Sequence, residues 1–149
     1  MTAIQIAKDV LKAGHSNWRK LMPDERETAQ LWSGGFAERM RTYVDTAYPA
    51  QSIANDAAMY QVLQDLSCTY CDEKYPIENL SLCFAAWAFA RRALTGKALD
   101  PYDSVARVSL LIREVKEGAY DDDDVLAALR IIREDLLAVI PLPSAQAAE

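Results

Sequence analysis

The sequence has 149 residues, of which 51% are hydrophobic and 26% are charged, and its formal net charge is −6. A chain of this length forms one domain that buries roughly 70% of the surface exposed when unfolded. Its composition excludes disordered and fibrous proteins. No segment reaches the roughly 20 continuous apolar residues of a membrane-spanning helix, so a soluble protein is expected.

The amino terminus and the cysteines bear on the compartment. The first residues lack the basic start and the uninterrupted apolar run of a secretory signal. Three cysteines in a chain of this length agree with a reducing environment, since secreted disulfide frameworks usually carry a denser and even set. A cytoplasmic location is therefore expected.

The negative charge is concentrated in the carboxy-terminal third. Residues 101–149 contain five Lys or Arg and ten Asp or Glu. A surface of this sign repels a phosphate backbone and attracts a basic surface. Nucleic-acid binding through this third is therefore not expected.

Apolar spacing predicts an all-α protein, a compact bundle of six or seven helices in one domain over residues 1–140. Apolar residues recur at helical spacing, whereas the strict alternation typical of strands is missing. The first helix is predicted from Thr2 to Lys12, with Gly14 as its stop. A second helix begins at Pro23, and the pair Gly34–Gly35 is expected to break the chain before a third, because two glycines cost about 2 kcal/mol in a helix interior.

The fifth predicted helix, about residues 78–94, differs from its neighbours. The fourth, from about Ile53 to Cys71, is amphipathic, but Leu80–Ala90 is apolar at every position except Ser81. A helix that is apolar on all sides is a buried one. The sequence therefore predicts a central buried helix.

The last two helices are predicted to form a hairpin. Asp100 and Pro101 suit the start of the sixth helix, and four of its apolar residues are predicted to face inward: Val105, Val108, Ile112 and Val115. The last helix, about Asp122 to Ile140, carries apolar residues at alternating spacings of four and three, a heptad seam that could form a homodimer with its copy in another chain. Residues 141–149, rich in Pro, Ala, Ser and Gln, are predicted to be a disordered tail.

Two motifs invite a chemical interpretation and fit it poorly. Cys68 and Cys71 have the spacing of a redox or metal site, but they fall at the carboxyl end of a predicted helix beside acids, where a thiolate is disfavoured. The four aspartates 121–124 lack the glycine and the distal glutamate of a calcium loop and precede a helix that they can cap. His15, the only histidine, is expected to cap a helix end.

No catalytic site is predicted. The sequence contains no phosphate-binding glycine loop and no Gly-x-Ser-x-Gly elbow. The acidic residues fall on polar helix faces. The protein is expected to be no enzyme and to use no cofactor and no metal.

The sequence instead predicts a non-enzymatic protein-binding module. Surplus aromatic residues make good interface anchors, and acidic residues steer a basic partner surface toward them. Such a module would be a stoichiometric inhibitor or an adaptor, of the kind that phages and mobile elements encode against host machinery or defence, or an immunity protein that masks a basic toxin. The predicted partner-binding residues are Tyr102, Asp103, Tyr120, Asp121, Asp122, Asp123 and Asp124.

An alternative prediction is a nucleic-acid-associated accessory factor, used in replication or packaging. A basic patch in the amino-terminal half, interleaved with aromatic residues, could contact a phosphate backbone although the whole chain is acidic. The residues of this patch are Arg19, Lys20, Arg39 and Arg41.

Overall fold

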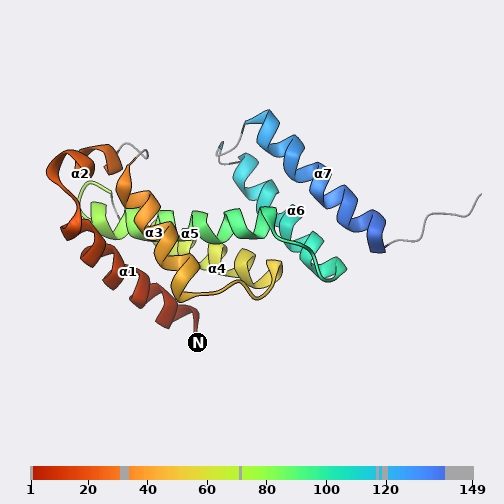
Figure 1. The fold of residues 1–149 in the computed structure, drawn as a ribbon, viewed down its shortest axis with the longest axis horizontal. Helices are drawn as coiled ribbons and strands as arrows, with labels where there is room; N and C mark the ends of the chain where they lie inside the picture. The colour runs from red at the N-terminus through yellow and green to blue at the C-terminus, as the bar shows by residue number, and fades with distance from the viewer. Residues whose placement is uncertain (1, 31–33, 71, 117, 119–120, 140–149) are drawn as a thin grey trace, which may run out of the picture.

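The computed structural model describes residues 2–30, 34–70, 72–116, 118 and 121–139. These residues form seven helices and no strand, which confirms the all-α prediction (Figure 1). The helices are α1 (Ala3–Lys20), α2 (Pro23–Gln30), α3 (Gly35–Ala47), α4 (Ile53–Ser67), α5 (Pro76–Thr95), α6 (Pro101–Lys116) and α7 (Asp122–Val139). The break expected at Gly34–Gly35 lies between α2 and α3, and the predicted tail, 141–149, lies outside the described residues.

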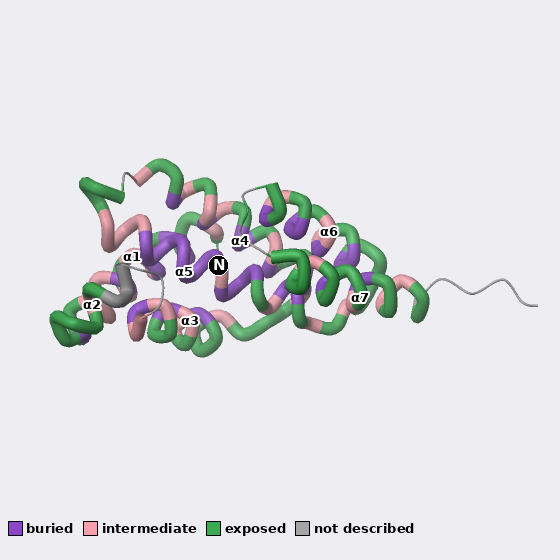
Figure 2. The backbone as a smooth tube through the Cα atoms, turned by 90° about the horizontal axis from the view of Figure 1, so that it is seen from above, coloured by how far each residue is buried: buried purple, intermediate pink, exposed green. Residues whose placement is uncertain are grey.

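Helix α5 is the centre of the bundle, as predicted. Every residue of Leu80–Ala90 is buried except Trp87, which is partly buried, and the buried stretch of the tube in Figure 2 runs along this helix. Helices α1, α3 and α4 pack around it (Figure 1). Pro76 occupies the first turn of α5, where its missing N–H costs no hydrogen bond.

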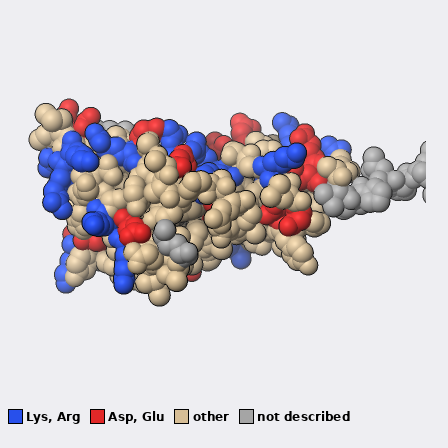
Figure 3. Space-filling model, turned by 60° about the horizontal axis from the view of Figure 1, so that its bottom comes forward, with Lys and Arg blue, Asp and Glu red and all other residues tan. Residues whose placement is uncertain are grey.

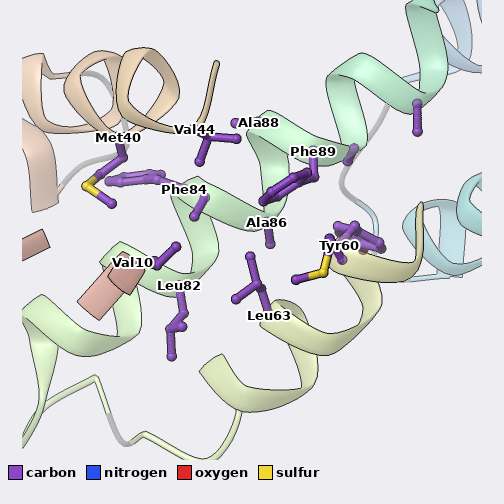
Figure 4. Close-up of a cluster of buried hydrophobic side chains, with 14 of the residues drawn as sticks. Val10, Met40, Val44, Tyr60, Leu63, Leu82, Phe84, Ala86, Ala88 and Phe89 are labelled. Atoms are coloured by element: carbon purple, nitrogen blue, oxygen red, sulfur yellow. The ribbon is translucent and has the colours of Figure 1, made fainter. Parts of the chain in front are cut away.

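The apolar core gathers side chains from these four helices. Val10, Met40, Leu63 and Phe84, one from each helix, belong to one cluster of buried side chains, and Met40 lies beside Phe84 in the close-up (Figure 4). The rings of Phe36 and Phe84 meet edge to face with centroids 5.8 Å apart, an arrangement that aromatic quadrupoles favour. This packing joins α3 to α5.

Helix α1 is longer than predicted and does not end at Gly14. It continues to Lys20, and Gly14 lies close to α5: a Cβ at this position would lie 1.9 Å from the Ser81 hydroxyl oxygen. The glycine therefore permits close helix packing instead of stopping the helix. His15, expected to cap a helix end, lies inside α1 with its Nε2 atom 3.1 Å from the Glu78 carboxylate of α5.

Helix α4 ends at Ser67, four residues before its predicted end. The chain tightens there, with the Thr69 N–H donating to the Leu66 carbonyl. The side-chain amide of Asn79 then donates to the carbonyls of Ser67 and Tyr70, at 3.0 and 3.1 Å. Long-range capping of this kind leaves no signal in local spacing.

The predicted inward face of α6 is wrong. Val105, Ile112 and Val115 are 62%, 54% and 49% exposed, and Val108 is only partly buried. The face that α6 turns to the rest of the protein consists of Asp103, Ser104, Arg107, Leu110, Leu111 and Glu114. Charged residues thus lie on the buried face of α6, whereas periodicity alone predicts that the valines face the core.

Arg107 explains this orientation. Its side chain has no exposed surface, and its Nε atom donates to the Ala93 carbonyl at 2.9 Å while a terminal nitrogen donates to the Gly96 carbonyl. The other terminal nitrogen lies 2.5 Å from the Asp135 carboxylate of α7. A buried charge costs several kcal/mol unless it is paired and hydrogen-bonded, so only the orientation that supplies all three acceptors is accessible.

Helix α7 lies beside α6 and runs antiparallel to it, which confirms the predicted hairpin (Figure 1). In the turn between them Gly118 has a positive φ of 69°, a conformation that glycine adopts without strain. Ala128 and Ile132 are buried, whereas Leu129 of the predicted seam is 47% exposed. Ile132 of the predicted seam therefore packs within the chain, whereas Leu129 stays exposed.

Candidate functional site: the α6–α7 hairpin

Exposed apolar side chains are concentrated on the α6–α7 hairpin. Of the eleven large hydrophobic residues that are exposed in the described chain, these two helices carry seven: Tyr102, Val105, Ile112, Val115, Leu126, Leu129 and Leu137. Single exposed apolar residues are normal on any protein, but neighbouring ones mark an interaction surface. The hairpin is therefore the strongest candidate for a binding surface.

The four predicted aspartates stand at the start of α7. Asp121, Asp122, Asp123 and Asp124 are all exposed. The Asp121 carboxylate accepts a hydrogen bond of 2.9 Å from the Asp124 N–H and so caps the helix, while the other three lie in its first turn, where they complement the helix dipole. Capping occupies one carboxylate, and the remaining carboxylates form an exposed acidic tip, Asp122–Asp124.

The structure does not bring all predicted partner-binding residues together. Tyr102 is 79% exposed at the start of α6. Because the helices are antiparallel, it lies at the opposite end of the hairpin from the acidic tip, about 24 Å away along a helix of sixteen residues. Tyr120 lies outside the described residues.

Asp103 is a structural residue instead of a surface acid. Its side chain is buried, and its two carboxylate oxygens accept hydrogen bonds from the backbone N–H groups of Ala54 and Leu99, at 3.1 and 2.8 Å. These bonds tie the start of α6 to the start of α4. We therefore remove Asp103 from the partner-binding set.

The predicted basic patch lies at the other end of the molecule. Arg19, Lys20 and Arg39 are exposed, and Figure 3 shows Lys and Arg side chains gathered at the end formed by α1, α2 and α3. Arg41 is bonded to the Glu38 carboxylate. The aromatic residue Trp18, expected within the patch, packs edge to face on Phe36, with ring centroids 5.2 Å apart.

A shallow groove of about 180 Å³ lies between α3 and α5 near this patch. Its lining is mostly apolar, and two of its basic residues already have acidic neighbours: Arg41 bonds to Glu38, and Arg91 lies 3.1 Å from Asp45. The lining residues are Ala37, Glu38, Arg41, Phe84, Trp87, Ala88 and Arg91. The groove is too small for the usual cofactors, whose pockets measure roughly 300 Å³ or more.

The cysteine motif lies only partly within the described residues. Cys68 is exposed at the carboxyl end of α4, where the sequence placed it, and Cys71 lies outside the described residues. Within the described ranges, no three His, Cys, Asp or Glu side chains are grouped closely enough to hold a metal ion. None of the described helices combines the length and the apolar composition needed to cross a bilayer.

Sequence reasoning missed the α6 part of this surface because it assigned the valines to the core. A signal was present: Asp103, Arg107 and Glu114 share one face of α6 at helical spacing. In the folded chain Arg107 pairs with Asp135 of α7, and Asp103 accepts hydrogen bonds from backbone N–H groups. Spacing shows that these residues share a face but not that this face is buried.

The comparisons with known proteins identify no relative. No protein-family profile matches the chain, and no curated protein sequence or solved structure matches it either.

Proposed function

We propose that the protein is a non-enzymatic protein-binding module, a stoichiometric inhibitor or an adaptor, that presents the α6–α7 hairpin to a partner with a basic surface. The observation that best supports this proposal is the concentration of exposed apolar side chains on the hairpin. Removal of apolar side chains from water favours association, by roughly 25 cal/mol for each Å² of apolar surface buried. The anti-host, anti-defence and immunity roles expected from the sequence are all forms of this function.

The acidic tip supports a basic partner. Asp122, Asp123 and Asp124 are exposed beside the apolar residues Leu126 and Leu129, which follow in the next turns of α7. Charges at the rim of an interface increase the association rate and select the partner, while the apolar centre holds it. In this proposal the acidic tip attracts the basic partner and the neighbouring leucines hold it.

The proposal is tested by affinity capture with the full chain immobilised and exposed to a lysate of its native source. The test variants are Asp122→Asn, Asp123→Asn and Asp124→Asn combined, and Leu126→Lys with Leu129→Lys. We expect a specific protein to be retained by the wild type in a defined stoichiometry and at least tenfold less by each variant, with the triple-Asn variant weakening chiefly at low salt.

Two controls make the outcome decisive. Asp72→Asn with Glu73→Gln changes exposed acids elsewhere, and Ile4→Lys changes an exposed apolar residue on α1; both should leave retention unchanged. Equal retention by the wild type and both hairpin variants would refute the proposal. Failure of the immobilised wild-type chain to retain any protein from the lysate would also refute it.

One observation favours a second function, that of a nucleic-acid-associated accessory factor. The exposed cations Arg19 and Lys20 end α1 and Arg39 lies in α3, whereas the acidic tip begins α7, which lies apart from both helices (Figure 1). Binding to DNA or RNA that falls steeply with salt, and that weakens in an Arg39→Gln, Arg41→Gln variant, would favour this function over the first.

A further inference from the structure

We propose that two copies of this chain pair through α6, with the two helices antiparallel about a twofold axis beside Ser109. The contact residues form the α6 stripe, which we define as Val105, Val108, Ile112 and Val115. The spacings along it are three, four and three, the spacing of helices that pack along a seam. Val105, Ile112 and Val115 remain 62%, 54% and 49% exposed in the described chain, and Val108 is partly buried against the core.

The α6 stripe is complementary to itself. Its spacing reads the same in both directions, so antiparallel pairing sets Val105 opposite Val115 of the second copy and Val108 opposite Ile112. All four side chains are β-branched and lose little rotamer freedom when they become buried. A twofold interface requires one patch that matches its own copy, and the stripe meets this condition.

The residues that flank the stripe also match under the same symmetry. Ser109 is exposed and small, and it lies one residue from the midpoint of the stripe, where a larger side chain would hinder the approach of the two helices. Tyr102 and Lys116 are both exposed and lie near opposite ends of the stripe, on the same side of it. In the antiparallel pair, the Lys116 ammonium group of each copy therefore comes near the Tyr102 ring of the other. Asp100, also exposed, adds a carboxylate near the same ammonium group, which makes the pairing electrostatically favourable.

The area required by a stable dimer extends the interface beyond the stripe. A standard interface buries about 800 Å² on each partner, more than four aliphatic side chains expose. Tyr102, 79% exposed at the start of α6, adds an aromatic ring to the stripe, and we expect the two copies to associate weakly and reversibly. This inference rests on the proposed function, because it assigns the α6 half of the hairpin surface to a second copy and leaves the acidic tip for the other partner.

The first test measures the mass of the full chain by sedimentation equilibrium over a wide range of concentration. We expect a reversible dimer and, for Ile112→Lys, a dimer dissociation constant raised at least tenfold. Ile112 is more than half exposed, so circular dichroism and thermal unfolding should show the variant folded. Ile4→Lys, which alters an exposed isoleucine of α1, is the matched control and should dimerise as the wild type does.

The second test determines the orientation. In a background with Cys68→Ser and Cys71→Ser, Ser109→Cys should be cross-linked to its own copy by a short bismaleimide, whereas Thr42→Cys, exposed on α3, should not. A chain that is monomeric at every concentration overturns the inference. So does a dimer whose dissociation constant is unaffected by Ile112→Lys, or a Ser109→Cys variant that is not cross-linked. A monomer that still captures a basic partner overturns this inference alone, whereas a dimer that captures none overturns only the proposed function.

Discussion

The guanidinium of Arg107 joins three helices from a position without solvent exposure. It donates to the carbonyls of Ala93 and Gly96, at the carboxyl end of α5, and pairs with Asp135 of α7. Carbonyls in the last turn of a helix have no partner within the helix. Arg107 supplies that partner while remaining neutralised by a carboxylate.

Replacement of Arg107 by alanine should lower the free energy of unfolding by about 3–5 kcal/mol, because it leaves buried carbonyls and a carboxylate without their donor. Urea denaturation followed by circular dichroism measures this change. Arg91→Ala is the control: Arg91 pairs with Asp45 at 3.1 Å with both side chains well exposed, and such pairs contribute at most about 1 kcal/mol. Equal losses in the two variants would contradict the role assigned to Arg107.

Tyr48 should make the fold sensitive to alkaline pH. Burial raises the pKa of its hydroxyl above the ordinary value, and Tyr43 and Asp9, whose oxygens both lie 3.4 Å away, raise it further. The folded state therefore keeps this proton at a pH where the unfolded chain has lost it, so the free energy of unfolding is unaffected below about pH 10 and falls above it. Urea titrations at rising pH should show a shallower decline for Tyr48→Phe, and Tyr102→Phe, at an exposed site, should decline as the wild type does.

At the scale of elements, the sequence was most informative where one physical effect dominated. Leu80–Ala90 is apolar at almost every position, so its burial in α5 could be predicted without knowledge of its neighbours. The ends of α6 could also be predicted, because Asp100 and Pro101 start it and Gly118 follows it. These signals are local.

The orientation of α6 could not be predicted, because it depends on residues distant in the sequence. Arg107 is buried only because Ala93, Gly96 and Asp135 come together around it. The acidic tip of the candidate site was predicted from its exposed aspartates, but the α6 stripe was missed for the same reason. Periodicity locates an apolar face and cannot say whether that face packs within the chain or remains outside.

The contact between α1 and α5 gives a prediction at this scale. Gly14→Ala places a Cβ 1.9 Å from the Ser81 hydroxyl oxygen and 2.5 Å from its Cβ, so the two helices must separate. Overpacking of this kind costs about 1–3 kcal/mol, which outweighs the better helix propensity of alanine. Thermal unfolding should show the loss.

Ser81→Gly removes the atoms that clash and serves as the partner in a double-mutant cycle. The double variant Gly14→Ala, Ser81→Gly should be more stable than the sum of the two single changes implies. Simple additivity would show that the glycine at position 14 is not there for close packing.

At the scale of the whole molecule, most of the core and the candidate binding surface lie in different parts of the chain. The helices around α5 hold the aromatic contacts of the core, whereas the α6–α7 hairpin carries seven of the exposed large apolar side chains and the acidic tip. Helix α7 has few contacts outside α6. The candidate binding surface is thus carried by the part of the protein with the smallest share of the core.

The position of Arg107 has a consequence for cooperativity. Proteins open locally in units of contiguous structure, and the weakest unit determines which surfaces are transiently released. The Arg107 side chain of α6 bonds both to the end of α5 and to α7, so separating α6 from α5, or α7 from α6, breaks hydrogen bonds of this one residue. The hairpin and the end of the central helix are therefore expected to open together, and their local unfolding disrupts the whole binding surface at once.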